Sequence, residues 1–188
     1  MSAAAPLIQR HRYSVAEYYR MAETGILKPD ERVELIEGEI IDMPPIGIEH
    51  AYVVTRLTAI FTRKAGNKAI VSVQNPIRLN PHSEPQPDIA LLRYRKDFYR
   101  HTRPGPEDVL LLIEVADSSL RFDQEIKLPL YARHGIPEVW IADLGHQLLE
   151  IYRRPAEGKY FEKLIPERGE IVAPEGLAEF GIEWGELF

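Results

Sequence analysis

Three charged side chains lie in or beside apolar segments, where an ionised group is costly to bury. Asp88 directly precedes the apolar run 89–92, Glu114 interrupts the apolar run 109–116, and Lys127 follows in a segment with a helical pattern. Two carboxylates on adjacent strands can hold Mg²⁺ through oxygen ligands, and such an ion polarises a phosphodiester. A nearby ammonium can orient the attacking water or stabilise the charge of the transition state. Two carboxylates and a lysine in this arrangement suit metal-assisted hydrolysis of a phosphodiester.

Each of the three residues also has a simpler explanation when it is taken alone. Asp88 could face solvent at the start of its strand, and Glu114 could form an ion pair with a core arginine or lysine. Lys127 lies four residues after Asp123, so the two could form a surface pair on one helical face. The combination favours chemistry, because the two acids and the lysine follow one another on consecutive elements.

Several other polar residues could support these three. Glu34 alternates with apolar neighbours, so it could reach the site as an additional acid or face solvent. His50 begins a predicted helix, where it could cap the helix or contact a substrate phosphate or a water. Gln86 stands two residues before Asp88 and could assist it. These alternatives stay open at this point.

A basic and aromatic segment follows the strand after Asp88. Arg93, Arg95 and Lys96 begin this segment, which continues to residue 103. Cations mixed with aromatic rings suit phosphate contacts and base stacking, although most basic runs are solvated loops. The segment is therefore a candidate nucleic-acid contact, with the solvated loop as its alternative.

The composition limits the class of protein. With 188 residues the chain is long enough for one domain, expected over residues 13–188 after a flexible lead over residues 1–12. The absence of cysteine excludes disulfides and thiolate metal sites. No apolar run reaches the roughly 18 residues of a membrane span, and the start lacks a secretory signal, so we expect a soluble cytoplasmic protein with no membrane partner. The net charge of −6 gives no bulk attraction for nucleic acid.

The hydrophobic pattern predicts an α/β fold that would hold the charged residues on a sheet. Continuous apolar runs are typical of strands covered on both faces, and strand 109–117, its following helix and strand 138–143 form a predicted right-handed βαβ unit. Tyr131, Trp140 and Tyr152 are expected in the core, and the tail 169–188 is poorly patterned. The predicted helices are 15–23 (with a Ser14–Glu17 capping box), 50–65 and 123–135; the predicted strands are two within 31–43 around Gly38, then 69–79, 87–93, 109–117, 138–143, 147–153 and 159–165.

The motif formed by Pro87, Asp88 and the segment 114–116 resembles the PD-(D/E)XK signature of restriction-endonuclease-like nucleases. That signature has a lysine two residues after the glutamate, where this chain has Ala116. The same departure occurs in a narrower group. Over residues 12–155, and most specifically in LLIEVADSSLRFDQEIKLPLYARHGIPEVWIADL, the chain resembles the bacterial Uma-two family of endonuclease-like proteins.

The resemblance implies a restriction-endonuclease-like core, with a mixed central sheet flanked by helices. It implies Asp88 and Glu114 as metal ligands, the carbonyl of Val115 as a further ligand, and Lys127 as the catalytic lysine that replaces the missing one on the strand. It also implies Mg²⁺ or Mn²⁺ as cofactor, DNA as substrate and a homodimer as assembly. The competing hypothesis is a catalytically silent module of the same fold that binds nucleic acid or dimerises, which the net negative charge favours.

Overall fold

The computed structural model describes residues 10–188, apart from the side chain of residue 186. Most of the predicted flexible lead, residues 1–9, therefore lies outside the described residues. Its last residues contact the rest of the protein, because Arg12 Nε donates a hydrogen bond to the backbone oxygen of Glu37 at 2.8 Å. The bounds of the single predicted domain stay a prediction.

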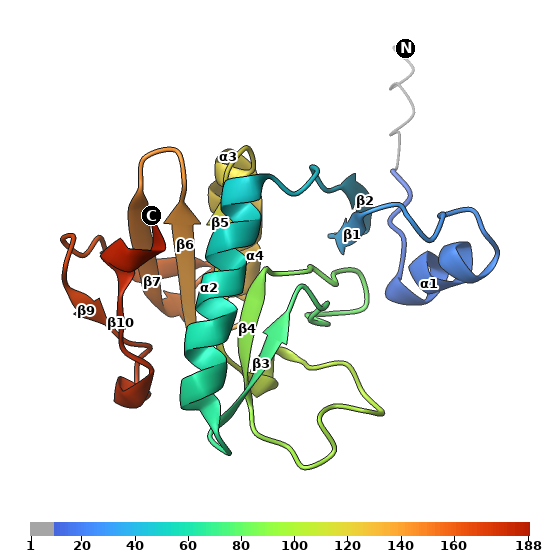
Figure 1. Cartoon of the computed structure of the whole chain (residues 1–188). Coiled ribbons are helices and arrows are strands. Elements are labelled where there is room, and N and C mark those ends of the chain that lie inside the picture. The colour runs from blue at the N-terminus through green and yellow to red at the C-terminus, as the bar shows by residue number, and fades with distance from the viewer. Residues whose placement is uncertain (1–9) are drawn as a thin grey trace.

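A six-stranded mixed sheet forms the centre of the fold (Figure 1). The central pair β5 and β6 is parallel, and every other neighbouring pair in this sheet is antiparallel. This confirms the predicted mixed sheet and the βαβ unit, because parallel neighbours need a crossover connection. In spatial order the strands are β3 (Ala69–Val73), β4 (Ile89–Arg93), β5 (Val109–Ala116), β6 (Glu138–Asp143), β7 (Leu148–Ala156) and β8 (Lys159–Leu164).

Helices cover both faces of this sheet (Figure 1). Helix α2 (Ile48–Ala65) packs on one face, where Ile89 and Leu91 of β4 point. The helical segment after β5 packs on the other face, where Ala90 and Leu92 of β4 point. Alternate residues of one strand thus enter two different cores, which explains why the strand sequences are apolar without interruption.

The helix between β5 and β6 begins earlier than predicted. The sequence suggests 123–135, whereas the structure has α3 (Leu120–Phe122), a π-helical turn (Asp123–Lys127) and α4 (Leu128–Arg133). Pro129 has no N–H for an i→i−4 bond, and the wider turn before it absorbs this mismatch. The π turn carries two buried charged residues, Asp123 and Lys127, so the irregular backbone coincides with the predicted catalytic lysine.

The strand predicted over 69–79 is also shorter in the structure. It ends at Val73, because Gln74 adopts a left-handed backbone conformation with φ of 49°. The N–H of Gln74 then donates to the backbone oxygen of Asp88 at 2.9 Å. The early end of this edge strand brings a polar side chain beside the start of β4.

The N-terminal elements form a separate layer beside the sheet (Figure 1). Helix α1 (Val15–Glu23) has the predicted capping box between Ser14 and Glu17. Strands β1 (Val33–Ile36) and β2 (Glu39–Asp42) form the predicted hairpin. Gly38, with φ of 83°, is required at its turn, because a Cβ there would lie 2.6 Å from the Cβ of Arg12.

The tail contributes to the core in spite of its weak sequence pattern. Its two short strands, β9 (Ile171–Val172) and β10 (Ile182–Glu183), pair with each other, and a 3₁₀ turn spans Ala178–Phe180. Phe180 and Trp184 are buried in the core that α2 covers. The other 3₁₀ turns are Pro106–Asp108 and Trp184–Leu187. Across residues 10–188, no helix has the length and apolar character needed to cross a membrane.

Candidate active site

Strand pairing brings Asp88 and Glu114 to opposite positions on adjacent strands. Strands β4 and β5 are antiparallel with Ile89 opposite Ile113, so continuing the register by one residue sets Asp88 opposite Glu114. Residues that are directly opposite in an antiparallel pair point to the same face of the sheet, with Cβ atoms roughly 5 Å apart. Two carboxylates therefore meet where β4 begins and β5 approaches its end.

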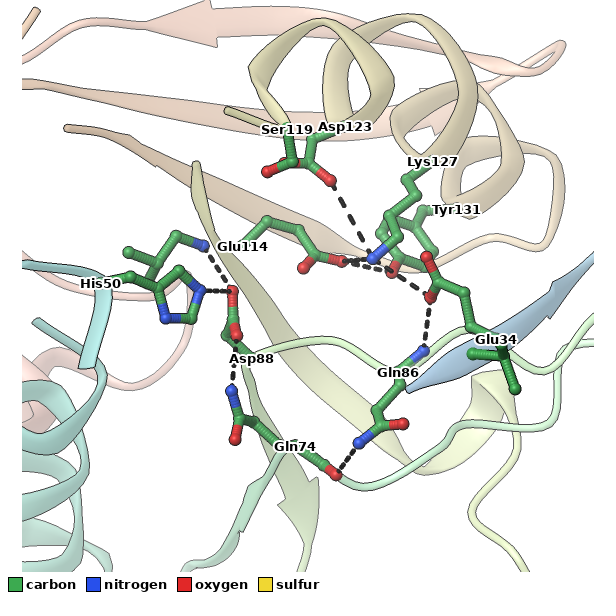
Figure 2. A network of polar contacts seen from close by, with 12 residues as sticks. Glu34, His50, Gln74, Gln86, Asp88, Glu114, Ser119, Asp123, Lys127 and Tyr131 are labelled. Atoms are coloured by element: carbon green, nitrogen blue, oxygen red, sulfur yellow. Dashed lines mark hydrogen bonds and ion pairs between the residues drawn. The ribbon is translucent and has the colours of Figure 1, made fainter. Parts of the chain in front are cut away.

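Asp88 is held by three hydrogen-bond donors (Figure 2). His50 Nε2 donates to Oδ2 at 3.1 Å, the backbone N–H of Val115 donates to Oδ2 at 2.9 Å, and Gln74 Nε2 donates to Oδ1 at 3.1 Å. Burial alone would raise the pKa of Asp88, but the hydrogen bonds, chiefly that from His50, lower the pKa below its usual value. The carboxyl is ionised at neutral pH, so the proton of the pair belongs to His50 Nε2.

Glu114 lies on β5 in a drier environment. The side chain is buried, and its Oε1 accepts hydrogen bonds from Tyr131 Oη at 2.5 Å and from Lys127 Nζ at 3.3 Å. Burial raises the pKa of Glu114 well above its usual value, and the acids Asp123, Asp88 and Glu34 raise it further against the opposing effect of Lys127. The charged form of this carboxyl therefore depends on nearby cations.

Lys127 is the cation at the centre of the network (Figure 2). Its Nζ lies 3.2 Å from Glu34 Oε2, 3.3 Å from Glu114 Oε1 and 3.9 Å from Asp123 Oδ1. Burial would lower the pKa of Lys127, but these carboxylates, Glu114 first, raise it above its ordinary value. Lys127 is therefore an ammonium ion at neutral pH, facing three acids with one positive charge.

Asp123 is a further buried acid beside Lys127. Ser119 Oγ donates to Asp123 Oδ2 at 2.7 Å, and the carboxyl is buried on the π turn. Burial raises the pKa of Asp123 to about 6, although Lys127 and Ser119 act in the opposite direction. One cation does not neutralise this group of acids.

The acids and the lysine line one cavity of about 480 Å³. Asp88, Glu114 and Lys127 all belong to its wall, together with apolar residues of the segment 43–47. Its charged lining residues are mostly acidic, so its electrostatics favour a bound cation. These charged residues are Glu34, Asp42, Asp88, Glu114, Asp117 and Asp123 against Arg32 and Lys127.

The donor chemistry of the site fits Mg²⁺ or Mn²⁺. The carboxylates of Asp88 and Glu114 are hard oxygen donors, and Mg²⁺ sites commonly use only one or two carboxylates together with water. In a strand the N–H and C=O of one residue point to the same edge, so the carbonyl of Val115 points toward Asp88, as its N–H does. Within residues 10–188 no three acidic or histidine side chains are arranged to share one ion.

Several alternatives from the sequence can now be decided. Glu34 does not face solvent, because it is 3 % exposed and accepts a hydrogen bond from the backbone of Gln86 at 2.9 Å. His50 is not a helix cap, because α2 begins at Ile48 after Gly47 and the imidazole points to Asp88 instead. Lys127 is not a surface residue, although its pairing with Asp123 is present.

Gln86 reaches Asp88 only through another residue. Gln86 Nε2 donates to the backbone oxygen of Gln74, and the side chain of Gln74 is the one that contacts Asp88. Gln74 was not predicted from the sequence, because nothing local indicates that the residue after β3 turns back toward β4. Tyr131 was predicted as a core residue, and its aromatic ring is fully buried, but its hydroxyl also reaches Glu114.

The basic segment after β4 lies away from this cavity. Arg93 ends β4 while Asp88 precedes its start, so five residue steps, about 17 Å of strand, separate them. Arg95 is paired with Asp97 at 2.8 Å within its own loop. The structure therefore does not bring Arg93, Arg95 and Lys96 together with the acids, and their contact with nucleic acid stays a prediction.

Comparisons with known proteins agree with this architecture. A family profile described as "Uma2: Putative restriction endonuclease" matches residues 15–185. The fold is similar to the crystal structure of a "putative nuclease belonging to DUF820" from Anabaena variabilis, with a TM-score of 0.70 and 16% sequence identity over 93% of this chain and 98% of that chain. No curated protein gives a significant match.

Proposed function

Because the chain belongs to the Uma2 family of restriction-endonuclease-like proteins, we propose that it is a metal-dependent endonuclease that hydrolyses phosphodiester bonds in DNA. The observation that carries the proposal is the burial of Lys127 against Glu114 at a cavity that Asp88 also lines. The buried lysine compensates for Ala116, because an ammonium reaches Glu114 from the following helix instead of from the strand.

Asp88 and Glu114 are the proposed metal ligands, with the carbonyl of Val115 as a third. Asp88 is kept ionised by its hydrogen bonds, so it is ready to bind a cation at neutral pH. Mg²⁺ or Mn²⁺ held there would supply Lewis-acid stabilisation of the charge on the scissile phosphate. His50 and Gln74 orient the Asp88 carboxylate, as groups around metal ligands commonly do.

Lys127 is proposed to act as a fixed positive charge. Its raised pKa keeps it protonated, which disfavours a role as general base and favours stabilisation of negative charge in the transition state. Glu34 holds the ammonium from the other side at 3.2 Å and is proposed as a supporting acid. The three acids around one lysine leave room in the charge balance for a divalent cation.

A cleavage assay tests the proposal. Purified protein is incubated with plasmid, linear duplex DNA, single-stranded DNA and RNA, each with Mg²⁺, with Mn²⁺ and with a chelator. We expect DNA cleavage that requires the metal and that Asp88→Asn abolishes. Asp97→Asn is the matched control, because Asp97 is an exposed aspartate paired with Arg95 in the distant loop.

The other outcomes of this assay are equally informative. Metal-dependent cleavage of RNA alone would replace DNA as the substrate and keep the proposed centre. No cleavage of any substrate, with no divalent ion bound, would overturn the proposal in favour of a silent module of the same fold. The net charge of −6 is the feature that favours such a module.

Two copies of the chain are also proposed to associate as a homodimer. Closed two-fold dimers are the commonest assembly of soluble proteins, and a dimer would let two centres act on the two strands of a duplex. Sedimentation velocity at several protein concentrations measures the oligomeric state directly. A mass corresponding to one chain of 21.6 kDa at every concentration would contradict this expectation.

A further inference from the structure

A buried tyrosine hydroxyl stands behind the Glu114 carboxylate (Figure 2). Tyr131 comes from α4 and is fully buried. Its ring lies in the core on the face of the sheet opposite α2. Its Oη donates to Glu114 Oε1 at 2.5 Å. A phenylalanine would supply the same packing without a hydroxyl that must find a buried partner, so packing alone does not explain the tyrosine.

The hydrogen bonds to Glu114 are unevenly divided between its two oxygens. Both Tyr131 and Lys127 donate to Oε1, at 2.5 and 3.3 Å. Figure 2 shows the second carboxylate oxygen of Glu114 on the side of Asp88. Two donors on one oxygen fix the orientation of a side chain that otherwise has three rotatable bonds, and the second oxygen is then presented toward the other proposed ligand.

Tyr131 itself is not part of the cavity wall, whereas Glu114 and Lys127 are. Its hydroxyl therefore does not reach a bound ion or substrate directly and acts only through Glu114. On the basis of the proposed function, we infer that Tyr131 is a positioning residue. Its hydroxyl holds Glu114 Oε1 and so presents the second oxygen of Glu114 toward Asp88, where the divalent cation would be held.

The chain offers a matched control for this inference. Tyr152 is also buried, lies in the same core and donates to a glutamate, with its Oη 2.6 Å from Glu150 Oε2. Neither Tyr152 nor Glu150 lines the cavity. Tyr131→Phe and Tyr152→Phe therefore remove the same kind of hydrogen bond, one beside the proposed ligand and one away from it.

The test is the affinity for Mn²⁺ alone, measured by electron paramagnetic resonance of the free ion without any nucleic acid. Loss of a group that orients a metal ligand typically weakens binding by about 10- to 100-fold, and we expect this for Tyr131→Phe. Tyr152→Phe should bind Mn²⁺ as the wild type does. Thermal unfolding of both variants establishes that they remain folded.

A second measurement covers the case in which Tyr131→Phe does not fold. 3-Fluorotyrosine placed at position 131 keeps the hydroxyl, and its ¹⁹F resonance is followed during a Mg²⁺ titration. The resonance should shift with the same midpoint as metal binding, while the same label at position 152 should not move. If the protein with 3-fluorotyrosine at position 131 binds the metal ion as tightly as the wild type, a conservative replacement that keeps the hydroxyl preserves the function that Tyr131→Phe loses.

The outcomes separate this inference from the proposed function. Wild-type protein that binds Mn²⁺, with Tyr131→Phe binding equally well, overturns the role of Tyr131 and leaves the metal site intact. An unmoved ¹⁹F resonance at position 131 during metal binding overturns it in the same way. Wild-type protein that binds no Mn²⁺ overturns the metal site and the role of Tyr131 together.

Discussion

Two buried glutamates on neighbouring strands of the sheet differ in how their charge is balanced. Glu138 on β6 accepts hydrogen bonds from Trp140 Nε1 at 2.5 Å and Arg153 at 2.9 Å on one oxygen, and from the backbone of Glu175 at 2.6 Å on the other. Glu114 on β5 shares a single lysine with two further acids.

We infer that the difference separates a structural carboxylate, Glu138, from the proposed metal ligand, Glu114. Glu138 has one cation, has both oxygens satisfied and ties the C-terminal segment to the sheet, since Arg153 also donates to the backbone of Ala173 at 2.8 Å. Glu114 is left with an uncompensated excess of negative charge at the wall of a cavity. A protein gains no stability from gathering unbalanced acids in its interior, so this group supports the proposed metal-binding role of Glu114.

The largest effect on stability is expected at Glu138, whose charge is balanced by Arg153. Glu138→Ala leaves the Arg153 guanidinium, which is only 17% exposed, without its carboxylate. Removing one partner of a buried ion pair costs roughly 3–5 kcal/mol, so chemical denaturation should show a loss of that size. Metal-dependent cleavage by the folded fraction should be unchanged.

The matched control for this prediction is an exposed pair. Glu162→Ala removes the partner of Arg154, which is 72% exposed, and should cost less than about 1 kcal/mol. Equal losses from the two substitutions would show that Glu138 has no special structural role.

The next effect is on cleavage rather than stability. Lys127→Met removes the fixed ammonium beside Glu114 and should lower the cleavage rate by about 10²- to 10³-fold, as loss of one preorganised electrostatic group does. Lys163→Met is the control, because Lys163 contacts Glu150 at 2.6 Å outside the cavity. A Lys127→Met protein with wild-type rate constants would remove the lysine from the catalytic account.

The smallest effect is a gain in stability when one of the three acids around Lys127, Asp123, loses its charge. The folded pKa of Asp123 is about 6, above its ordinary value of 3.8. As the pH rises from about 4 to 6 the unfolded chain loses this proton first, so ionisation of Asp123 lowers the free energy of unfolding, and the loss is complete above pH 6. Asp123→Asn should therefore be more stable than the wild type at pH 7, by at most about 3 kcal/mol.

The pH dependence checks this sign. The gain of Asp123→Asn should disappear below about pH 4, where the wild-type carboxyl is protonated in both states. Glu125→Gln changes an exposed acid of the same turn and should alter stability by less than about 0.5 kcal/mol at either pH. A loss of stability in Asp123→Asn at pH 7 would mean that its ion pair with Lys127 outweighs its burial.

Local sequence information predicted most of the fold. Helix α1, the hairpin around Gly38 and strands β4 to β6 lie within a residue or two of their expected bounds, because capping residues, glycine and apolar runs act over short distances. The π turn was not predicted, since it depends on how the chain around Pro129 packs on the sheet. The tail was not predicted either, because its burial depends on contacts with α2.

The candidate site also contains residues that could be recognised from the sequence and partners that could not. Asp88 and Glu114 are recognisable because charge is unusual in apolar segments, and the role of Lys127 is implied by the family resemblance. Their partners come from distant segments: Glu34 from the hairpin, His50 from α2 and Gln74 from the end of β3. These contacts are set by tertiary packing, so the sequence left Glu34 and His50 with two alternatives each and gave no indication of Gln74.

One measurement tests the central claim most directly: the rate of Mn²⁺-dependent DNA cleavage by Glu114→Gln and Glu138→Gln, each compared with the wild type. Glutamine at position 114 has nearly the size of glutamate without the charge that is costly to bury there, so this variant should stay as stable as the wild type while its cleavage falls at least about 100-fold. Glu138→Gln should lose stability and keep its cleavage rate. Wild-type cleavage by a folded Glu114→Gln protein would contradict the account.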